Sequence, residues 1–431
     1  MPRPISNLRW YVAGLLCLAT TLNYLDRQAL SVLANTIQRD LGLTVVQYSW
    51  ITSSFLLSYT VMYLVSGRIV DRLGSRRGLT IAVSGWSVAN MLHGLARGAL
   101  QLSAFRFLLG VFESANWPAC VKAVAEWFPM RERAFGMGLF NSGAALGGAI
   151  AAPLVSVVAL HFGWRQAFVV TGALGFFWVL LWAKLYESPA KHPRLSDAER
   201  ALILEGDVGE TESGGSVPLR TLMRMRETWG CVAVRVFTDP VTYFLFFWIP
   251  KYLQDKHGFS LAALGFYVWI PYLASSVGAV FGGALPYKLV KRGWSVNRAR
   301  KTTMLVDSVF MLVCYLALLR VDSPVVVVAC IAAIMFGHSA WSNITIPAEV
   351  FPKRVVGTIS GLGGTLGGVA GILTQLGTGW VVQRFSYGPL FPIYGLLDLI
   401  AFGFVLWLVG ELGVIRPIPQ ARSAAPTGVS K

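Results

Sequence analysis

Long apolar segments constrain this chain more than any other feature of its sequence. A window of about 20 residues, the length of helix that crosses a hydrocarbon layer of about 30 Å, finds about a dozen of them. Charged residues make up only 13% of the chain, too few to cover a soluble protein of 431 residues. We therefore predict an all-α integral membrane protein with twelve transmembrane helices. The expected spans are 10–34, 48–70, 78–97, 99–127, 134–160, 165–186, 229–254, 261–288, 301–320, 324–347, 355–383 and 387–411.

The basic residues are distributed unevenly among the connections between these segments. One alternating set of connections contains Arg72, Arg131, Lys291 and Arg354 among others, whereas the other set has few basic residues. By the positive-inside rule the basic set faces the cytoplasm, which places both termini there. Because the basic residues do not form one patch with interleaved aromatic residues, the net charge of +16 does not indicate nucleic-acid binding. We expect a multi-pass protein in the lipid bilayer of a bacterial-type inner membrane.

A polar stretch divides the apolar segments six and six. Between Lys184 and Arg226 the chain is rich in acidic residues. Ser196 and Glu199 have the spacing of a helix capping box, which predicts a short helix that ends near Leu204. We expect an N-terminal six-helix bundle over 1–186, a cytoplasmic linker with that helix over 187–228, a C-terminal six-helix bundle over 229–412 and a flexible cytoplasmic tail over 413–431.

The two halves of the chain resemble each other. The run from Glu126 to Arg131 recurs from Glu349 to Arg354, with Phe-Pro at the same two positions, and each copy precedes a glycine-rich segment. Internal repetition of this kind is typical of transporters built from two related bundles, and closely spaced glycines let helix backbones approach each other. We predict two pseudo-symmetric bundles, although ordinary helix packing accounts for most of these glycines individually.

Charged residues inside the predicted membrane helices mark the candidate site, because a charge in lipid is costly. The first segment contains Asp26 and Arg27; the fourth contains Arg106 and Glu113, two turns apart on one helix face. Two guanidinium groups in one cavity form a receptor for a carboxylate, since each offers paired hydrogen bonds and stays charged. Two carboxyl groups in the same cavity are suited to carry protons. The alternative is static ion pairs that brace helices one and four.

Other polar residues of the membrane segments are less specific candidates. His338 and Asn343 in the tenth segment are expected to contact substrate hydroxyl groups, although a single membrane histidine is more often a packed hydrogen-bonding group. Arg235 and Asp239, one turn apart, are interpreted as an intrahelical pair or, alternatively, a substrate contact. Asp307 and Asp398 receive no role. Further candidates for the substrate site are Tyr24, Tyr59, Asn141 and Ser142.

Nothing in the sequence indicates catalysis or a bound cofactor. No Ser/His/Asp set or phosphate-binding loop is evident, and the five cysteines have neither CxxC nor metal-ligand spacing. We expect no cofactor, no metal site and no enzymatic activity.

The loop after the second segment carries a family signature. From Gly67 to Arg77 it places an Asp-Arg pair between glycines, followed by two further arginines, and with this spacing it resembles the signature of the major facilitator superfamily. We expect a cytoplasmic gate in which Asp71 pairs with basic residues of a neighbouring helix in one conformation and releases them in the other. The alternative is a solvated basic loop that only sets the topology. The gating candidates are Asp71, Arg72, Arg76, Arg131 and Arg354.

Within that superfamily the chain resembles the anion:cation symporter family, and in particular its hexuronate-transporter branch. The resemblance extends over nearly the whole chain. It implies that Arg27 and Arg106 engage the substrate carboxylate, and that Asp26 and Glu113 take part in proton coupling. It also implies that Tyr59 lines the cavity. The chain departs from the family pattern at Ala144, where related sugar-acid transporters have a glutamine, so recognition of the substrate's hydroxyl groups is expected to differ. The matching motifs lie at 23–27, 106–118, 126–129, 141–143, 195–200, 248–250, 337–342 and 361–364.

From the residues and the resemblance we predict proton-coupled import of a small organic anion, a hexuronate such as glucuronate or galacturonate, by alternating access of the two bundles. The expected partners are the anion and protons, and the protein is expected to act as a monomer. One alternative is the same fold acting as an exchanger or carrying another acid, such as an aldonate, tartrate or an aromatic carboxylate. The other is a membrane sensor that binds its ligand without translocating it.

Overall fold

The structure of the chain is a computed structural model, which describes residues 7–204, 217–341 and 345–415. Part of the predicted linker and most of the predicted tail lie outside these residues. The described residues form helices joined by short turns and contain no strand. The side chains of Leu64, Met130, Arg131, Ala134, Leu204, Lys353 and Arg354 are outside the description as well.

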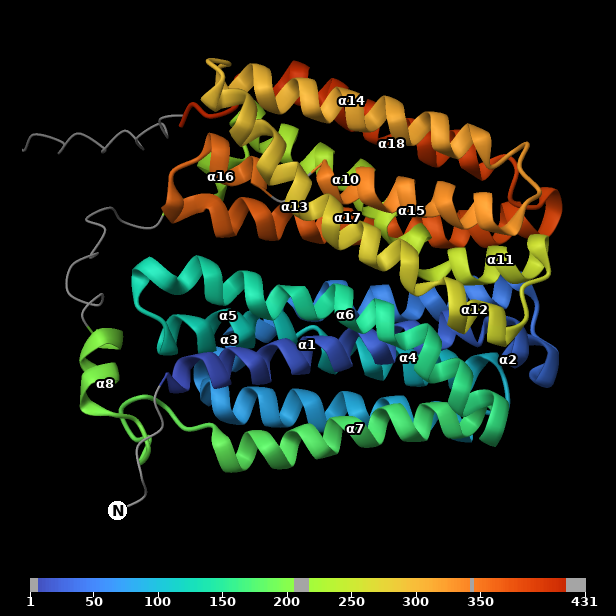
Figure 1. Cartoon of the computed structure of the whole chain (residues 1–431), viewed down its shortest axis with the longest axis horizontal. Coiled ribbons are helices and arrows are strands. Elements are labelled where there is room, and N and C mark those ends of the chain that lie inside the picture. The colour runs from blue at the N-terminus through green and yellow to red at the C-terminus, as the bar shows by residue number, and fades with distance from the viewer. Residues whose placement is uncertain (1–6, 205–216, 342–344, 416–431) are drawn as a thin grey trace, which may run out of the picture.

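Figure 1 shows the helices in two groups that lie side by side. The first group contains α1 (Leu8–Val32), α2 (Ala34–Leu41), α3 (Val45–Leu92), η1 (His93–Leu95), α4 (Ala99–Glu113), α5 (Asn116–Trp127), α6 (Met130–Phe162) and α7 (Trp164–Leu185). The second contains α10 (Arg226–Phe247), α11 (Ile249–His257), α12 (Leu261–Tyr267), α13 (Trp269–Lys291), α14 (Val296–Ala317), α15 (Pro324–Ala340), α16 (Ile346–Val350), α17 (Lys353–Phe385), α18 (Leu390–Phe404) and η3 (Val405–Val409). Between them lie α8 (Asp197–Leu204) and α9 (Leu219–Leu222).

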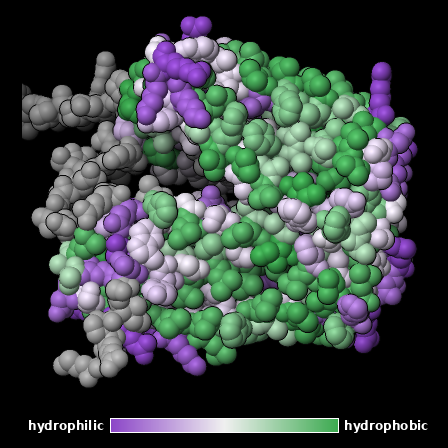
Figure 2. Space-filling model, in the orientation of Figure 1, coloured by the Kyte–Doolittle hydropathy of each residue, from purple (hydrophilic) through white to green (hydrophobic). Residues whose placement is uncertain are grey.

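The molecule has two polar ends and an apolar belt. We call the end at which α1 begins and α8 lies the terminal end, and the opposite end, which carries α2, α11 and α12, the distal end (Figure 1). Figure 2 shows hydrophilic residues gathered at both ends and mainly hydrophobic residues on the face between them. Such a belt suits a lipid bilayer. Six helical spans of the described residues are long and apolar enough to cross a membrane: Phe135–Phe162, Trp164–Leu185, Arg226–Phe247, Leu261–Lys291, Val355–Phe385 and Leu390–Val409.

Prolines explain why several predicted spans consist of two helices. α5 begins two residues before Pro118, α11 one residue before Pro250, and α13 two residues before Pro271. Proline lacks a backbone N–H, and the first turn of a helix is where that group has no partner within the helix. Each proline therefore starts a new helix segment, so the spans expected over 99–127, 229–254 and 261–288 each consist of two consecutive helices.

Gly74 reverses the chain within α3. Its φ of +76° lies in a region that residues with a side chain rarely adopt, so the helix breaks there. Residues on the two sides of the break meet again, since a Cβ atom on Gly78 would lie 3.4 Å from the Val70 side chain. The break separates the second predicted span from the third and exposes the Asp71 loop at the terminal end.

The linker helix α8 is fastened to the start of α1. Ser196 accepts the backbone N–H of Glu199 at 3.3 Å, which is one half of the predicted capping box. The Glu199 carboxylate turns instead to α1, where it accepts the backbone N–H groups of Leu8 and Arg9 at 3.0 and 3.1 Å and a guanidinium nitrogen of Arg9 at 2.8 Å. A carboxylate is stabilising at a helix N-terminus because unpaired N–H groups point at it.

Hydrogen bonds between the two groups gather at the distal end. The Tyr48 hydroxyl donates to the backbone oxygen of Phe247 at 2.7 Å, and the Val46 N–H donates to Gln383 at 3.1 Å. Gly148 of α6 lies against the ring of Tyr272, 2.6 Å from where a Cβ atom would stand. Figure 2 shows a hollow between the two groups at the terminal end. In this conformation the distal end is closed.

Candidate functional site

Arg27 on α1 and Glu113 on α4 form a buried ion pair. Nε and one terminal nitrogen of Arg27 both donate to Oε2 of Glu113, at 3.0 and 2.9 Å. The Glu113 side chain has no exposed surface and that of Arg27 is 10% exposed. A buried charge is tolerated only when it is paired, so the two charges neutralise each other and join α1 to α4.

Aromatic rings enclose the guanidinium of Arg27. Its central carbon lies 4.7 Å from the ring centre of Tyr24, 5.0 Å from that of Phe55 and 4.9 Å from that of Tyr59. A terminal nitrogen also donates to Oδ1 of Asn23 at 3.1 Å. Ring faces attract a cation and exclude water from it. The structure thus brings three predicted site residues, Arg27, Tyr24 and Tyr59, together around one cationic group.

Arg106 lies inside the first group of helices. Its side chain is fully buried, and one terminal nitrogen donates to the backbone oxygen of Arg27 at 3.3 Å. Among the described residues, its Nε and its other terminal nitrogen have no hydrogen-bond partner. The sequence predicts that Arg27 and Arg106 converge on one carboxylate, and in this conformation they do not. The reason is that Glu113, two turns along the same face of α4, holds the guanidinium of Arg27.

Asp26 points away from Arg27, because adjacent residues on a helix diverge by about 100°. Its Oδ1 accepts a hydrogen bond from the amide of Asn90 at 2.7 Å. The same amide nitrogen donates to Thr171 at 2.8 Å, so Asp26 is fully buried between α1, α3 and α7. Asp26 is therefore bonded to an amide of its own group of helices, and not to Glu113 with which the sequence interpretation associates it.

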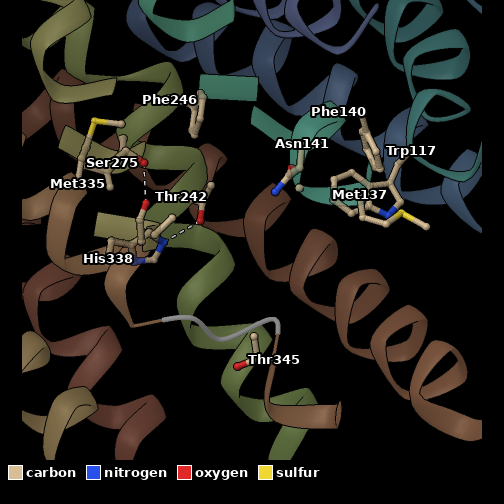
Figure 3. A pocket seen from close by; sticks show the side chains of 14 residues that line it. Trp117, Met137, Phe140, Asn141, Thr242, Phe246, Ser275, Met335, His338 and Thr345 are labelled. Carbon is tan, nitrogen blue, oxygen red and sulfur yellow. Dashed lines mark hydrogen bonds between the residues drawn. The ribbon is translucent and has the colours of Figure 1, made fainter. Parts of the chain in front are cut away.

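A cavity of about 500 Å³ lies between the two groups of helices (Figure 3). Asn141 of α6 reaches it from one side, and His338 of α15 and Thr242 of α10 reach it from the other. Nε2 of His338 and the Thr242 hydroxyl are 2.8 Å apart and share a hydrogen bond. A mainly apolar cavity with a few converging polar groups is typical of a small-molecule site. Two predicted site residues, Asn141 and His338, face each other across it.

Tyr24 connects the Arg27 pair with this cavity. Its ring centre lies 6.0 Å from that of Phe246, and Phe246 lines the cavity. Arg27 itself does not line it, nor does Ser142, whose hydroxyl donates to the backbone oxygen of Leu139 at 2.7 Å. The anion-binding candidate therefore lies next to the cavity wall, behind an aromatic layer.

Sequence reasoning missed several polar groups of the cavity wall. Ser275 and Ser339 line it, with their hydroxyl oxygens 2.6 Å apart, and Thr242 lines it as well. Thr242 follows Asp239 by three residues, so the two share a helix face. That spacing could have identified Thr242 as a candidate site residue. The serines carried no comparable signal, because a serine in a membrane helix commonly bonds a carbonyl group of its own helix.

The second group of helices contains its own buried charges. Nε of Arg235 lies 2.8 and 2.9 Å from the two carboxylate oxygens of Asp239, so the intrahelical pair expected as one alternative is present. Tyr63 of the first group lies within electrostatic reach of both. Asp307 and Asp398 are also buried. Nothing in the sequence indicated partners for these two aspartates.

The predicted gating residues are described in part. Oδ1 of Asp71 accepts from Nζ of Lys122 on α5 at 3.2 Å, and Arg76 pairs with Glu187. Arg72 is exposed. The side chains of Arg131 and Arg354, and all of Asn343, lie outside the described part of the chain, so their roles stay predictions. Within the described residues, no group of three or more His, Cys, Asp or Glu side chains is placed to hold a metal ion.

Comparisons with known proteins identify relatives. A family model of the Major Facilitator Superfamily matches residues 16–375. The chain is 32% identical over 414 residues to the hexuronate transporter of Escherichia coli. The matched region covers 94% of this chain and 95% of that protein. It is 28% identical over 418 residues to a D-galactonate transporter of Escherichia coli, with 94% and 96% covered. The inward open conformation of the xylose transporter XylE from E. coli has a similar fold, with a TM-score of 0.72, 15% identity, and 94% of this chain and 97% of that chain covered. The predicted fold class, a multi-pass helical membrane protein of two bundles, is confirmed.

Proposed function

This chain belongs to the major facilitator superfamily, and from that premise we propose that it imports a small organic anion, a hexuronate such as glucuronate or galacturonate, together with protons. As a member of this superfamily it is a membrane transporter and not an enzyme. Two relatives are named as carriers of sugar acids, a hexuronate and D-galactonate. A carboxylate is therefore the group that the site has to recognise.

The pairing of Arg27 with Glu113 supports recognition of a carboxylate. The guanidinium already holds one carboxylate, with two N–H groups directed at a single oxygen of Glu113. A substrate carboxylate has the same geometry and charge, so it can take the place of Glu113 on Arg27. Tyr24 and Tyr59 against the guanidinium leave it less hydrated and strengthen that bond.

Exchange of carboxylates also couples the anion to a proton. Protonation of Glu113 removes its negative charge and with it most of its attraction for Arg27. Arg27 then binds the substrate anion, and the proton and the anion are loaded together. On release, Glu113 loses its proton and its carboxylate returns to Arg27 in place of the anion. The structure has the pairing of this final step, with the Glu113 carboxylate bonded to Arg27.

Asp26 is the second proton-carrying candidate. It lies in the same group of helices, and Arg106 is within electrostatic reach of both Asp26 and Glu113. A change of charge on either carboxyl group therefore alters the field at Arg106. We assign Arg106 the role of linking the two carboxyl groups, with direct substrate contact only after Glu113 has moved.

The closed distal end and the hollow terminal end support transport by alternating access. Basic loops at the terminal end mark it as cytoplasmic by the positive-inside rule, so the present conformation faces inward. Opening to the outside requires the two bundles to rock around the site. The Asp71–Lys122 pair near the terminal end then belongs to the machinery that changes between the two states. The protein works as a monomer in an inner membrane.

Hydroxyl recognition decides which sugar acid is carried. Asn141 and His338 face the cavity from opposite groups, and both can donate and accept hydrogen bonds. An aldonate is the second candidate substrate, because one relative is named as a D-galactonate transporter. Competition of unlabelled galactonate with labelled glucuronate for uptake distinguishes the two.

Uptake into proteoliposomes tests the proposal. We expect an inward proton gradient to drive uptake of labelled glucuronate, and Arg27→Ala and Arg106→Ala to abolish it. Arg320→Ala, at an exposed position in the connection between α14 and α15, is the matched control and should retain uptake. Uptake that is indifferent to the proton gradient, or undiminished in both arginine variants, would disprove the proposal. Binding of glucuronate without counterflow would instead indicate a sensor.

A further inference from the structure

The second group of helices contains a histidine–carboxylate pair, of which the proposed function uses only His338, for contact with substrate hydroxyl groups. His338 lies on α15 and Asp398 lies on α18, so the two residues are far apart in the sequence. Nδ1 of His338 and Oδ1 of Asp398 are 3.4 Å apart. The other ring nitrogen, Nε2, is bonded to the Thr242 hydroxyl at 2.8 Å. The ring is therefore held between a hydroxyl on the cavity side and a carboxyl group inside the bundle.

The two members of the pair differ in their access to the cavity. The Asp398 side chain is 1% exposed, whereas that of His338 is 12% exposed and lines the cavity between the two groups. Figure 3 shows His338 and Thr242 together on that wall. Among the described residues, neither Oδ1 of Asp398 nor Nδ1 of His338 has a hydrogen-bond partner, so their contact at 3.4 Å is electrostatic. The imidazole thus stands between Asp398 and the cavity.

The burial of Asp398 beside His338 suits a pair that shares one proton. A lone ionised carboxylate in an apolar bundle is very unfavourable, and no cation other than His338 is paired with Asp398 among the described residues. The pair is neutral with the proton on Asp398, and it is an ion pair of zero net charge with the proton on His338. Loss of the proton leaves a net negative charge in the bundle.

Groups on the neighbouring helices do not remove that requirement. Asp239 of α10 lies within electrostatic reach of His338, but its own charge is paired with Arg235. Tyr315 of α14 lies within reach of Asp398 and supplies a hydroxyl, not a charge. The remaining titratable group nearby, Tyr394 of α18, is 2.7 Å from the Thr378 hydroxyl. Among the described residues, these neighbours are one further acid, its paired arginine and two phenols, and α14 also carries the buried acid Asp307.

We propose that His338 and Asp398 form a second proton-carrying site, in the C-terminal bundle, which takes up and releases one proton through the cavity during the transport cycle. His338 exchanges the proton with water or substrate at Nε2, turning from Thr242, and passes it to Asp398 through Nδ1. Rearrangement of the cavity during the cycle changes the solvation of His338, and the pair gains or loses its proton accordingly. The inference rests on the proposed function, since a coupled proton has meaning only in a proton-driven carrier.

The proton of the pair can be detected without any transport. Infrared difference spectra of the purified, substrate-free protein, recorded between acidic and alkaline pH, report protonated carboxyl and imidazolium groups. We expect bands in the wild-type protein that Asp398→Asn and His338→Gln both lose. Asp322→Asn and His257→Gln are the matched controls, because both residues lie at the distal end away from the cavity, and they should retain the bands. Spectra of Asp398→Asn identical to those of the wild type would overturn the inference.

Proton flux measures the role of the pair in coupling. Proteoliposomes with a pH-sensitive dye inside give the number of protons that enter with each labelled glucuronate. We expect Asp398→Asn to transport one proton fewer, which lowers the highest accumulation ratio about tenfold for each unit of pH gradient. Glucuronate exchange at equal pH should persist in this variant, which shows that it is folded. An unchanged ratio in a folded variant overturns the coupling role.

Failure of the proposed function and failure of the second proton-carrying site give different results. If the wild-type protein takes up glucuronate without protons, or not at all, the proposed function fails, while the infrared spectra still decide whether the pair holds a proton. If wild-type uptake is proton-driven and Asp398→Asn matches it in both spectra and ratio, only the second site fails.

Discussion

Asn35 of α2 and Lys251 of α11 meet across the distal end, where Nζ of Lys251 donates to Oδ1 of Asn35 at 2.7 Å. The Asn35 amide nitrogen in turn donates to Oδ1 of Asp255 at 2.6 Å, and Asp255 accepts from the Tyr387 hydroxyl at 2.7 Å. Asn35 belongs to the first group of helices and the other three residues to the second. Opening the distal end therefore has to break both bonds of Asn35.

Asn35→Ala should shift the protein towards the conformation with an open distal end. A hydrogen bond contributes about 1 kcal/mol net, so loss of both bonds of Asn35, about 2 kcal/mol, changes the ratio of the two conformations about thirtyfold. Thr52 is buried at the distal junction of α3 and α17, bonded to Gln375. In a background without the five native cysteines, labelling of Thr52→Cys by an impermeant maleimide measures the opening. Gln38→Ala is the control, because Gln38 donates to Leu43 within the first group, and it should leave the labelling rate unchanged.

Arg27→Lys should weaken binding of the anion even though it keeps the charge. Lysine cannot direct two fixed N–H groups at one carboxylate or lie flat against Tyr24 and Tyr59. Loss of one charge-assisted bond, about 1.5–3 kcal/mol, raises the Kd for glucuronate at least tenfold. Calorimetric titration of the purified protein measures it, with Arg320→Lys as the control. Equal affinity in Arg27→Lys would show that the carboxylate binds elsewhere.

Glu113→Gln should uncouple the anion from the proton. Glutamine has the shape of a protonated glutamate and leaves Arg27 without a competing carboxylate. We expect glucuronate to bind and exchange across the membrane, while a pH gradient drives a lower accumulation than in the wild type, because the proton of Glu113 no longer enters with the anion. Exchange and gradient-driven uptake, measured in the same proteoliposomes, separate the two effects. Gradient-driven accumulation equal to that of the wild type would exclude Glu113 as the coupling group.

The sequence was sufficient for the fold class and for the identity of the charges in the apolar segments, because apolar length and the cost of a buried charge are properties of local sequence. It did not reveal where prolines divide a segment into two helices. It did not reveal which charges pair. Arg27 had Asp26, Arg106 and Glu113 as possible neighbours, and the rotation of α1 against α4 selected Glu113. His338 and Asp398 lie on different helices, so their contact depends on the packing of α15 and α18. The hydrogen bonds of Asn35 at the distal end likewise depend on how helices of the two groups pack.

Glu199→Gln should destabilise the protein without altering its transport. The Glu199 carboxylate caps α1 with two backbone N–H groups and also binds Arg9. Replacement by an uncharged amide removes the charge assistance, worth about 1–2 kcal/mol. Thermal unfolding in detergent should show a lower Tm, whereas Asp197→Asn on the same helix should show a smaller change because Asp197 is exposed. Equal values of Tm for the two variants would mean that α8 does not hold α1.

Gly143 and Gly138 of α6 give a matched pair for testing helix packing. The glycine-rich pattern predicted close helix contacts but did not distinguish one glycine from another. A Cβ atom on Gly143 would collide with the backbone oxygen of Cys17 on α1 and stand 3.0 Å from the Thr20 side chain, whereas a Cβ atom on Gly138 would meet nothing within 4 Å.

Gly143→Ala should therefore force α1 and α6 apart, at a cost of about 1–3 kcal/mol. Gly138→Ala should instead leave the protein as stable or make it slightly more stable, since alanine favours the helix by about 0.5–1 kcal/mol over glycine. Thermal unfolding of both variants measures the difference. Because α1 carries Arg27, the displacement in Gly143→Ala should also weaken glucuronate binding. Gly138 lines the cavity, so Gly138→Ala serves as the control for stability only. If both variants had the same Tm, the close approach of α1 and α6 would not contribute to the stability of the fold.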